Sequence, residues 1–484
     1  MLVAAAFLRF QQIDRRPFHA DEAVQAYQTW RLLRGEGYTY DPADRHGPLL
    51  YYAAAGLAKT AGWSPATLNE SRLRSLTLLA GLATLALILA HADKLGRSTV
   101  LIGAALLAVA PLAVIYDTYF IQEAGFCLLT WALFFAALQW WDQPGFAGAV
   151  IIGALAGLMQ ATKETSVLHF AALGAALMTA RWTVLGGTRP PDGFSRAGMA
   201  ETRPEAGFHL KKINHGLTAL LTAVFIYVLF YSAFFTRWAG VTDGLLSYFN
   251  YAARAAGSAH DQPWYYYFSM LWPHSREGVH WGEPLLLLVA LIGAGFAFTR
   301  GASLTHRAVA VFTLTLLLLY SIIPYKTPWL LLTPYVGLTV LAGFGAVQLV
   351  AWLPGKFAHY APVSIGLVLV VACVWWNFPA LSRYANDERN PYVYQPTSGD
   401  LVRLVTTVAA MPADRKISVI SPDHAWPLPW YWRERALTGY FSTPPANLAA
   451  YDFVLFDSRL DTPLPATVTA FGLRPNVVLW CTSP

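Results

Sequence analysis

Residues 328–352 read PWLLLTPYVGLTVLAGFGAVQLVAW, a run without a single aspartate, glutamate, histidine, lysine or arginine. A helix needs about 20 apolar residues to cross the hydrocarbon core of a bilayer. Backbone groups in lipid must find their hydrogen bonds within the segment, so such a run is expected to be a helix. Nine similar runs occur, at 72–92, 98–116, 124–141, 146–161, 165–184, 216–236, 284–299, 308–323 and 361–381.

The composition agrees with a membrane protein. Of 484 residues, 56% are hydrophobic and 13% are charged, whereas a soluble protein carries about a quarter charged residues. The net charge of +6 comes from loop arginines, and no basic patch interleaved with aromatic residues indicates a nucleic-acid partner. Cys127 and Cys373 lie inside apolar runs and Cys481 lies outside them, so no disulfide or zinc pattern is expected.

Counting Met1–Ile13 as a first span, short or trimmed at its start, gives about eleven transmembrane helices. If the loop 14–71 lies outside, the inner loops hold eleven lysines and arginines and the later outer loops hold five. This asymmetry follows the positive-inside rule. We therefore expect a multi-pass protein of the cytoplasmic (plasma) membrane, with its unusual polar residues on the outer face.

The chain is expected to divide into two parts. Residues 1–382 form an all-α polytopic transmembrane domain, and the outer loop 14–71 within it carries interfacial helices. From 383 to 484 the composition changes, and short strands at Ile417–Ile420, Tyr451–Asp457 and Asn476–Trp480 follow a helix that Ser398 can cap. These features predict a small extramembrane α/β domain on the outer face.

Asp21 and Glu22 open an amphipathic helix whose apolar positions begin at Ala23 and end before Gly35. One interpretation is helix capping, because the helix dipole favours negative charge in the first turn. The other is a carboxylate kept ionised at the membrane surface, where it can take a proton from a hydroxyl group. His46 precedes a second, shorter helix over 48–61, either as a surface histidine or as a ligand for a phosphate or a metal.

Three short turns on the predicted outer side carry charges beside apolar runs. They contain Glu123, the neighbours Lys163 and Glu164, and Lys326. Ionisable residues near membrane depth usually face a polar cavity, although a lysine can also extend to the interface. Two lysines and several carboxylates at one cavity suit a substrate that is partly anionic and partly hydroxylated, such as a lipid-linked phosphosugar.

Two aromatic segments leave alternatives open. The outer loop 237–283 holds His260 among tryptophans and tyrosines, which form either an interfacial belt or a surface that stacks on a sugar. In the tail, the segment that begins at His424 and contains Trp-Pro-Leu-Pro-Trp is either the packed core of a small domain or a lid over the cavity.

At this point the residues resemble a known family, the GT-C membrane glycosyltransferases. The pattern of that superfamily, which includes the protein O-mannosyltransferases and the lipid A aminoarabinose transferase, is matched in order over about residues 10–350. The matching positions are Asp21-Glu22, His46-Gly-Pro48-Leu-Leu-Tyr51-Tyr52, Arg72 or Arg74, Glu123, Thr162-Lys163 and Lys326-Thr-Pro328. The combination of His19-Ala-Asp-Glu-Ala23 with Lys163-Glu-Thr165 and the Trp-Pro-Leu-Pro-Trp segment of the tail looks most like the archaeal and bacterial group named for flippase-associated activity.

The resemblance implies transfer of a sugar from a polyprenyl-phosphate donor to a hydroxylated lipid, glycan or protein acceptor, with inversion. Asp21 would be the general base, while Glu22 or Glu123 would hold the acceptor or a divalent cation. A divalent cation held by Asp21 and Glu123 is the one cofactor that the resemblance suggests. Substrate-binding roles would fall to the basic and polar residues of the outer turns, namely His46, Arg72, Lys163, Glu164, His260 and Lys326.

Two other interpretations remain. The chain is alternatively a lipid-linked sugar transporter or a flippase-associated protein without catalysis, or a degenerate relative kept for assembly. A transporter is expected to show internal repeats and helices broken at mid-membrane. The sequence shows neither, and its polar residues gather at helix ends on one face, which favours the enzyme.

Overall fold

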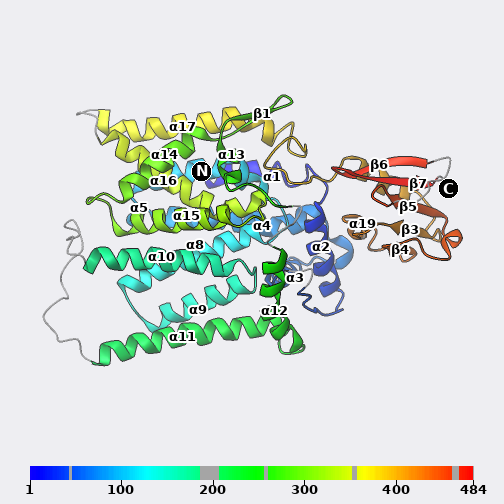
Figure 1. Ribbon diagram of the computed structural model, residues 1–484, viewed down its shortest axis with the longest axis horizontal. Helices are drawn as coiled ribbons and strands as arrows, with labels where there is room; N and C mark the ends of the chain where they lie inside the picture. The colour runs from blue at the N-terminus through cyan, green and yellow to red at the C-terminus, as the bar shows by residue number, and fades with distance from the viewer. Residues whose placement is uncertain are drawn as a thin grey trace.

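The computed structural model describes residues 1–42, 46–185, 206–254, 260–351, 357–423, 425–460 and 468–482. Its larger part is a bundle of long helices that run side by side along the longest axis of the molecule (Figure 1). The helices of the bundle are α1 (Leu2–Phe10), α4 (Glu70–Ala90), α5 (Ala92–Leu95), α6 (Arg97–Val109), α7 (Pro111–Tyr116), α8 (Glu123–Asp142), α9 (Phe146–Gln160), α10 (Ser166–Leu185), α11 (Ala206–Tyr231), α14 (Pro284–Ala297), α15 (Leu304–Ile322), α16 (Leu332–Val350) and α17 (Phe357–Leu381).

Among the described residues, six segments are long and apolar enough to cross a membrane, and four further apolar helices are shorter. Together with α1 they make the set of about eleven that the apolar runs predict. The prediction of a multi-pass, all-α membrane protein is confirmed. One run differs: 98–116 is broken into α6 and α7 at Pro111, because proline lacks the N–H group that would continue the helix.

Helix α16 lies at the centre of the bundle. Its apolar segment is 94% buried, whereas the corresponding segment of α11 is 6% buried and faces outward. Glycines let the neighbours of α16 approach closely, since a methyl group on Gly343 would overlap the carbonyl of Thr99 in α6, and one on Gly345 would overlap the carbonyl of Val289 in α14. Small residues at helix contacts are the usual means of tight packing in membranes.

Three helices lie crosswise at one end of the bundle: α2 (Ala20–Leu33), α3 (Leu49–Thr60) and α12 (Ala239–Arg254) (Figure 1). The same end holds the short elements η1 (Pro65–Thr67), α13 (Tyr266–Leu271), β1 (His274–Arg276), β2 (Val279–Trp281) and η2 (Pro328–Leu331). The first-loop helices agree with the sequence-based expectation. The β1–β2 hairpin was not expected, because its aromatic residues resemble an interfacial belt.

Helix α2 begins with a reciprocal cap. The side chain of His19 accepts the N–H of Asp21, and the carboxylate of Glu22 accepts the N–H of His19. Such an arrangement satisfies two backbone donors that a helix start otherwise leaves open. The capping interpretation therefore holds for Glu22, and its carboxylate also has a second partner.

That partner is Arg74 of α4, and both side chains are fully buried. Two guanidinium nitrogens of Arg74 each lie 2.7 Å from a carboxylate oxygen of Glu22. The same carboxylate accepts the N–H of Phe120 at 2.8 Å, and Arg74 also donates to the carbonyls of Ile13 and Arg16 at 2.9 Å. A bidentate pair with its remaining donors and acceptors satisfied is the form in which buried charges are tolerated.

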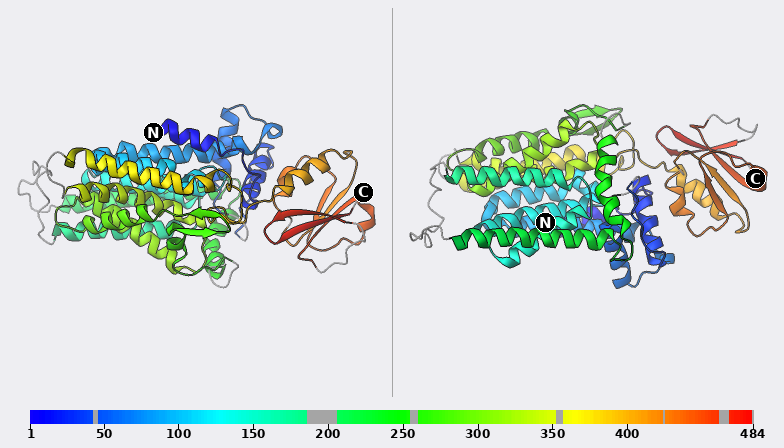
Figure 2. Two further views of the ribbon diagram at one scale, coloured as in Figure 1. Left: turned by 90° about the horizontal axis from the view of Figure 1, so that it is seen from above. Right: turned by 60° about the horizontal axis from the view of Figure 1, so that its bottom comes forward.

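The C-terminal part is a five-stranded sheet of order β4-β3-β5-β7-β6, set beyond α2 (Figures 1 and 2). Its elements are α18 (Asp400–Ala409), β3 (Ile417–Ile420), α19 (Leu428–Tyr431), β4 (Thr438–Phe441), η3 (Leu448–Ala450), β5 (Phe453–Asp457), β6 (Val468–Arg474) and β7 (Val477–Thr482). Strand β3 pairs in parallel with β4 and β5, and β7 runs antiparallel to β5 and β6. A small α/β domain is thus confirmed, while its boundary at residue 383 stays a prediction.

Replacing Glu22 by glutamine leaves the Arg74 guanidinium buried beside a neutral group. Loss of one member of a buried pair costs about 3–5 kcal/mol, so we expect Glu22→Gln to lower the Tm of the detergent-solubilised protein by at least about 5 °C. Asp21→Asn is the matched control, because it makes the same chemical change one residue earlier on a side chain that is 52% exposed. Equal melting of the two variants would contradict a structural role for Glu22.

The pair also predicts a pH dependence. Burial alone would raise the pKa of Glu22, but the charge and hydrogen bonds of Arg74 outweigh it and hold the pKa below the ordinary value of 4.5. The stabilisation is therefore present above that pH and is lost as the pH falls through the lower folded-state pKa. In melts from about pH 7 to about pH 3, we expect the Tm difference between the native protein and Glu22→Gln to narrow only at the acidic end.

Candidate functional site

Asp21 lies in the first turn of α2, at the end of the bundle that carries the crosswise helices. Its side chain is half-exposed, and a carboxylate oxygen lies 3.7 Å from Nδ1 of His19. In contrast to Glu22, it has no arginine partner among the described residues. Of the two predicted carboxylates, Asp21 is therefore the one that solvent and a substrate can reach.

Two side chains from distant segments share the electrostatic environment of Asp21. Burial, reinforced by the negative charge of Asp21, raises the pKa of Tyr394 to about 12. Burial lowers the pKa of His260, and the charges of Asp21 and Asp261 oppose that shift. Nδ1 of His260 is also hydrogen-bonded to the Tyr394 hydroxyl. Asp21, His260 and Tyr394 thus form one group, in which the histidine and the tyrosine are neutral near pH 7.

Lys326 joins this group through the backbone. Its N–H donates to the carbonyl of His260 at 3.1 Å, and its ammonium donates to the carbonyls of Gln262 and Ile323 at 2.9 and 2.6 Å. Burial lowers the pKa of Lys326, and the charge of Asp261 opposes the shift. The hydrogen-bonded partners of this cation are neutral, so they orient its charge without cancelling it.

The turn between α9 and α10 holds two further charge contacts. Lys163 forms an ion pair with Glu123 at the start of α8, and both side chains are nearly fully buried. The next residue, Glu164, lies 2.8 Å from Nδ1 of His46 and accepts the hydroxyl of Tyr40 at 3.3 Å. These four predicted residues, which come from three separate segments, are therefore brought together as two adjacent pairs.

Aromatic rings connect the Asp21 group to the α7–α8 turn. The ring of His19 lies 6.1 Å from the rings of both Tyr119 and Trp329, and Trp329 lies 5.4 Å from Tyr394. These rings come from the first loop, the α7–α8 turn, the turn before α16 and the segment after α17. They form the surface against which Asp21 is set.

Arg72 is not part of this arrangement. It is exposed, donates to the carbonyl of Thr67 and lies 5.3 Å above the ring of Trp63. Its neighbour two residues on, Arg74, is the one that reaches a first-loop carboxylate, that of Glu22. A substrate-binding role for Arg72 stays a prediction that these contacts do not support.

Sequence reasoning missed Arg16 as well as Tyr394. Arg16 is buried, donates to the carbonyl of Thr118 at 2.7 Å and lies 4.1 Å from the ring of Tyr119. Its Nε and Nη1 meet no acceptor among the described residues. The sequence signal for Arg16 was the basic pair Arg15-Arg16 shortly before the acidic pair Asp21-Glu22, because charges so close to a membrane helix need buried partners or a ligand.

The described residues contain no group of three or more histidine, cysteine, aspartate or glutamate side chains gathered as for a metal ion. The carboxylate of Glu123 is engaged by Lys163. A divalent cation on Asp21 and Glu123 therefore stays a prediction. His424, which opens the unusual tail motif, lies outside the described residues, as do Asp44 and Arg45 before the second predicted helix.

Comparison with solved structures gives clear relatives in fold. ArnT from Cupriavidus metallidurans bound to undecaprenyl phosphate matches 99% of this chain and 97% of its own, with a TM-score of 0.62 and 13% identity. The apo state of the same protein gives 0.61 and 14% over the same coverage. The archaeal oligosaccharyltransferase AglB from Archaeoglobus fulgidus, in complex with an inhibitory peptide and a dolichol-phosphate, matches 94% of this chain and 69% of its own, with a TM-score of 0.56 and 12% identity.

No protein-family model and no curated protein matches the sequence. At identities of 12–14% the structural matches establish the fold, and the subgroup named for flippase-associated activity stays a prediction. ArnT and AglB are both GT-C glycosyltransferases, which confirms the resemblance drawn from the first-loop carboxylates and the turn lysines. The chain therefore has the GT-C membrane fold.

Proposed function

We propose that the protein is an integral-membrane glycosyltransferase that moves a sugar from a polyprenyl-phosphate donor to a hydroxylated acceptor, with Asp21 as the general base. One observation carries the proposal. Of the first-loop carboxylates, Glu22 is locked by Arg74, whereas Asp21 is half-exposed beside neutral His260 and Tyr394. A base needs to be reachable and held in place, and Asp21 meets both requirements.

In the proposed reaction the acceptor hydroxyl loses its proton to Asp21 as its oxygen attacks the anomeric carbon. The bond between that carbon and the phosphate oxygen breaks, and the lipid phosphate leaves with the electron pair. A single displacement of this kind inverts the configuration at the sugar. The neutral His260 and Tyr394 are suited to hold a sugar or acceptor hydroxyl, because both can donate and accept hydrogen bonds.

The leaving phosphate gains negative charge, which nearby fixed cations stabilise. Lys163 is the first candidate: an ammonium carries three N–H groups, and Glu123 accepts one of them. Lys326, oriented by carbonyls, is the other candidate cation, and His46, which lies 2.8 Å from Glu164, would orient the phosphate. The presence of undecaprenyl phosphate in the ArnT structure and of dolichol-phosphate in the AglB structure supports a lipid phosphate as the donor class.

The proposal includes an orientation. The distribution of lysine and arginine along the sequence supports a topology in which the α2 end of the bundle and the C-terminal sheet lie on the outer face of the plasma membrane. The same distribution would suit a lipid-sugar transporter or a flippase-associated protein without catalysis. An active base separates the enzyme from both, because neither alternative needs proton transfer.

Asp21→Asn removes the base and keeps the size of the side chain. With a polyprenyl-phosphate sugar and a hydroxylated acceptor, we expect kcat to fall at least about 100-fold while the Tm stays at the native value. Glu36→Gln is the control, because Glu36 lies in the same loop in exposed ion pairs with Arg31 and Arg34, and it is expected to keep full turnover. Transport of the lipid without any transfer by the native protein would instead favour the transporter.

The Lys163–Glu123 pair gives a second test. Lys163→Met alone leaves Glu123 buried and unpaired, which destabilises, whereas replacing both charges of a buried pair is often close to neutral. We expect Lys163→Met/Glu123→Gln to recover the Tm lost in Lys163→Met but to stay at least about 100-fold below native in transfer, because the phosphate has lost its cation.

The partly exposed pair of Lys94, in α5, and Asp142, at the end of α8, provides the control for charge removal. The double variant Lys94→Met/Asp142→Asn is expected to match the native protein in both Tm and transfer. Recovery of transfer together with the Tm in the Lys163→Met/Glu123→Gln variant would show that the buried pair is structural and has no part in donor binding.

A further inference from the structure

The C-terminal part holds one residue of the first loop on both sides of its backbone. The N–H of Phe18 donates to the hydroxyl of Tyr431 at 3.0 Å, and the hydroxyl of Thr397 donates to the carbonyl of Phe18 at 2.7 Å. The ring of Phe18 is fully buried and lies 5.5 Å from the ring of Trp430. A segment three residues before Asp21 is thus fixed by groups 413 and 379 positions later in the chain.

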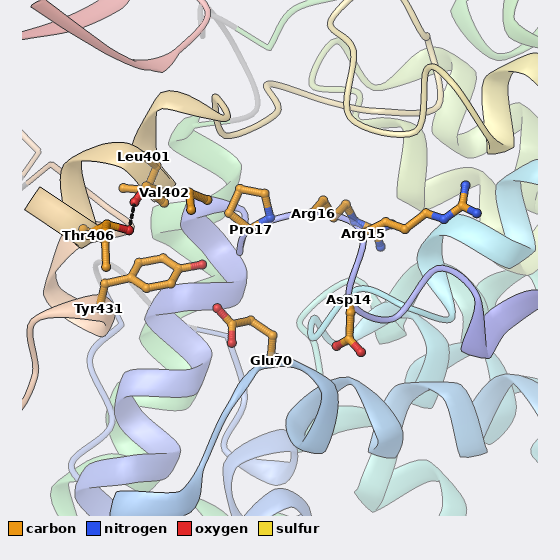
Figure 3. Close-up of a pocket in the computed structure, with 10 residues that line it drawn as sticks. Asp14, Arg15, Arg16, Pro17, Glu70, Leu401, Val402, Thr406 and Tyr431 are labelled. Atoms are coloured by element: carbon orange, nitrogen blue, oxygen red, sulfur yellow. Dashed lines mark hydrogen bonds between the residues drawn. The ribbon is translucent and has the colours of Figure 1, made fainter. Parts of the chain in front are cut away.

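Tyr431 is suited to this task because its hydroxyl also has a second partner. Burial and the neighbouring carboxylate of Glu70, at the start of α4, raise the pKa of Tyr431. The phenol is therefore neutral, faces the carboxylate of Glu70 (Figure 3) and keeps a lone pair for the N–H of Phe18. One side chain connects the C-terminal part, the first loop and the start of a membrane helix.

The contact between the C-terminal part and the first loop is local, because a cavity separates these two parts next to it. It has a volume of about 370 Å³ and lies between residues 14–17 and Glu70 on one side and α18 and Tyr431 on the other. Figure 3 shows the Tyr431 hydroxyl and the Glu70 carboxylate facing one another at its border. Because this cavity leaves the interface open beside Phe18, the hydrogen bonds of Tyr431 and Thr397 contribute much of the attachment of the C-terminal part to this stretch of the loop.

We infer that Tyr431 and Thr397 are positioning residues for Asp21, through Phe18 and the His19 cap of α2. The inference rests on the proposed function, because it gives the C-terminal part a role in the same reaction. Phe18 leads directly into the capped first turn, so a shift of its peptide group moves the Asp21 carboxylate. Rates of positioned reactions are sensitive to displacements of this size, and a 1 Å misplacement can cost about 100-fold.

The test removes one hydroxyl at a time in the full-length protein. In Tyr431→Phe and Thr397→Val we expect kcat to fall at least about tenfold while the KM for donor and acceptor stays within about twofold. Thr397→Ser keeps the hydroxyl and is expected to recover most of the rate. Tyr451→Phe and Thr407→Val make the same changes elsewhere in the C-terminal part and are expected to match the native protein.

Hydrogen exchange provides a readout that does not need turnover. In Tyr431→Phe and Thr397→Val the amides of residues 18–22 are expected to exchange about fivefold faster, the effect of losing one net hydrogen bond, with global Tm equal to the controls. Unchanged exchange, or equal rates for Thr397→Ser and Thr397→Val, would overturn the inference. If the variants exchange faster but the native protein transfers no sugar, the positioning role would stand and only the proposed function would be refuted.

Discussion

The buried pair between Glu22 and Arg74 is the constraint on which the first loop depends. Two charges removed from water are tolerated only when each is almost fully hydrogen-bonded, and here the carboxylate accepts from Arg74, His19 and Phe120. One side chain therefore ties together the start of α2, the start of α4 and the α7–α8 turn. Asp21 lies on the first of these segments, and the ring of Tyr119 on the last lies 6.1 Å from the ring of His19.

This constraint also separates the roles of two adjacent carboxylates. Successive residues of an α-helix point about 100° apart, so once Glu22 is directed into the bundle, Asp21 is directed away from it. The observed exposures follow, with Glu22 fully buried and Asp21 half-exposed. An acidic pair at a helix start can thus provide an anchor and a reactive group at once. The capping and catalytic interpretations of the motif are complementary, one for each residue.

Much of the architecture could be predicted from the sequence because lipid imposes strong rules on apolar runs. The runs gave the spanning helices, and positions at helix ends gave Asp21, Glu123, Lys163 and Lys326. The choice between Arg72 and Arg74 could not be made, since both lie near the start of α4 and only packing decides which one faces inward. Strands β4 and β6 were missed because they are held by neighbours in the sheet more than by their own pattern. Tyr394 could not be predicted because it lies more than 370 positions from Asp21 in the sequence.

The glycine contacts of α16 join three helices of the bundle into one rigid unit. Where backbones touch at Gly343 and Gly345, no side chain can yield, and the helices α6, α14 and α16 must move as one body. At the opposite margin, α11 presents almost its whole apolar segment to the surroundings and is supported mainly by α9. The same kind of contact joins α9 to α11, where a methyl group on Gly153 would overlap the carbonyl of Ala219, so this outer pair forms a second rigid unit and relative motion within the bundle must take place between the two.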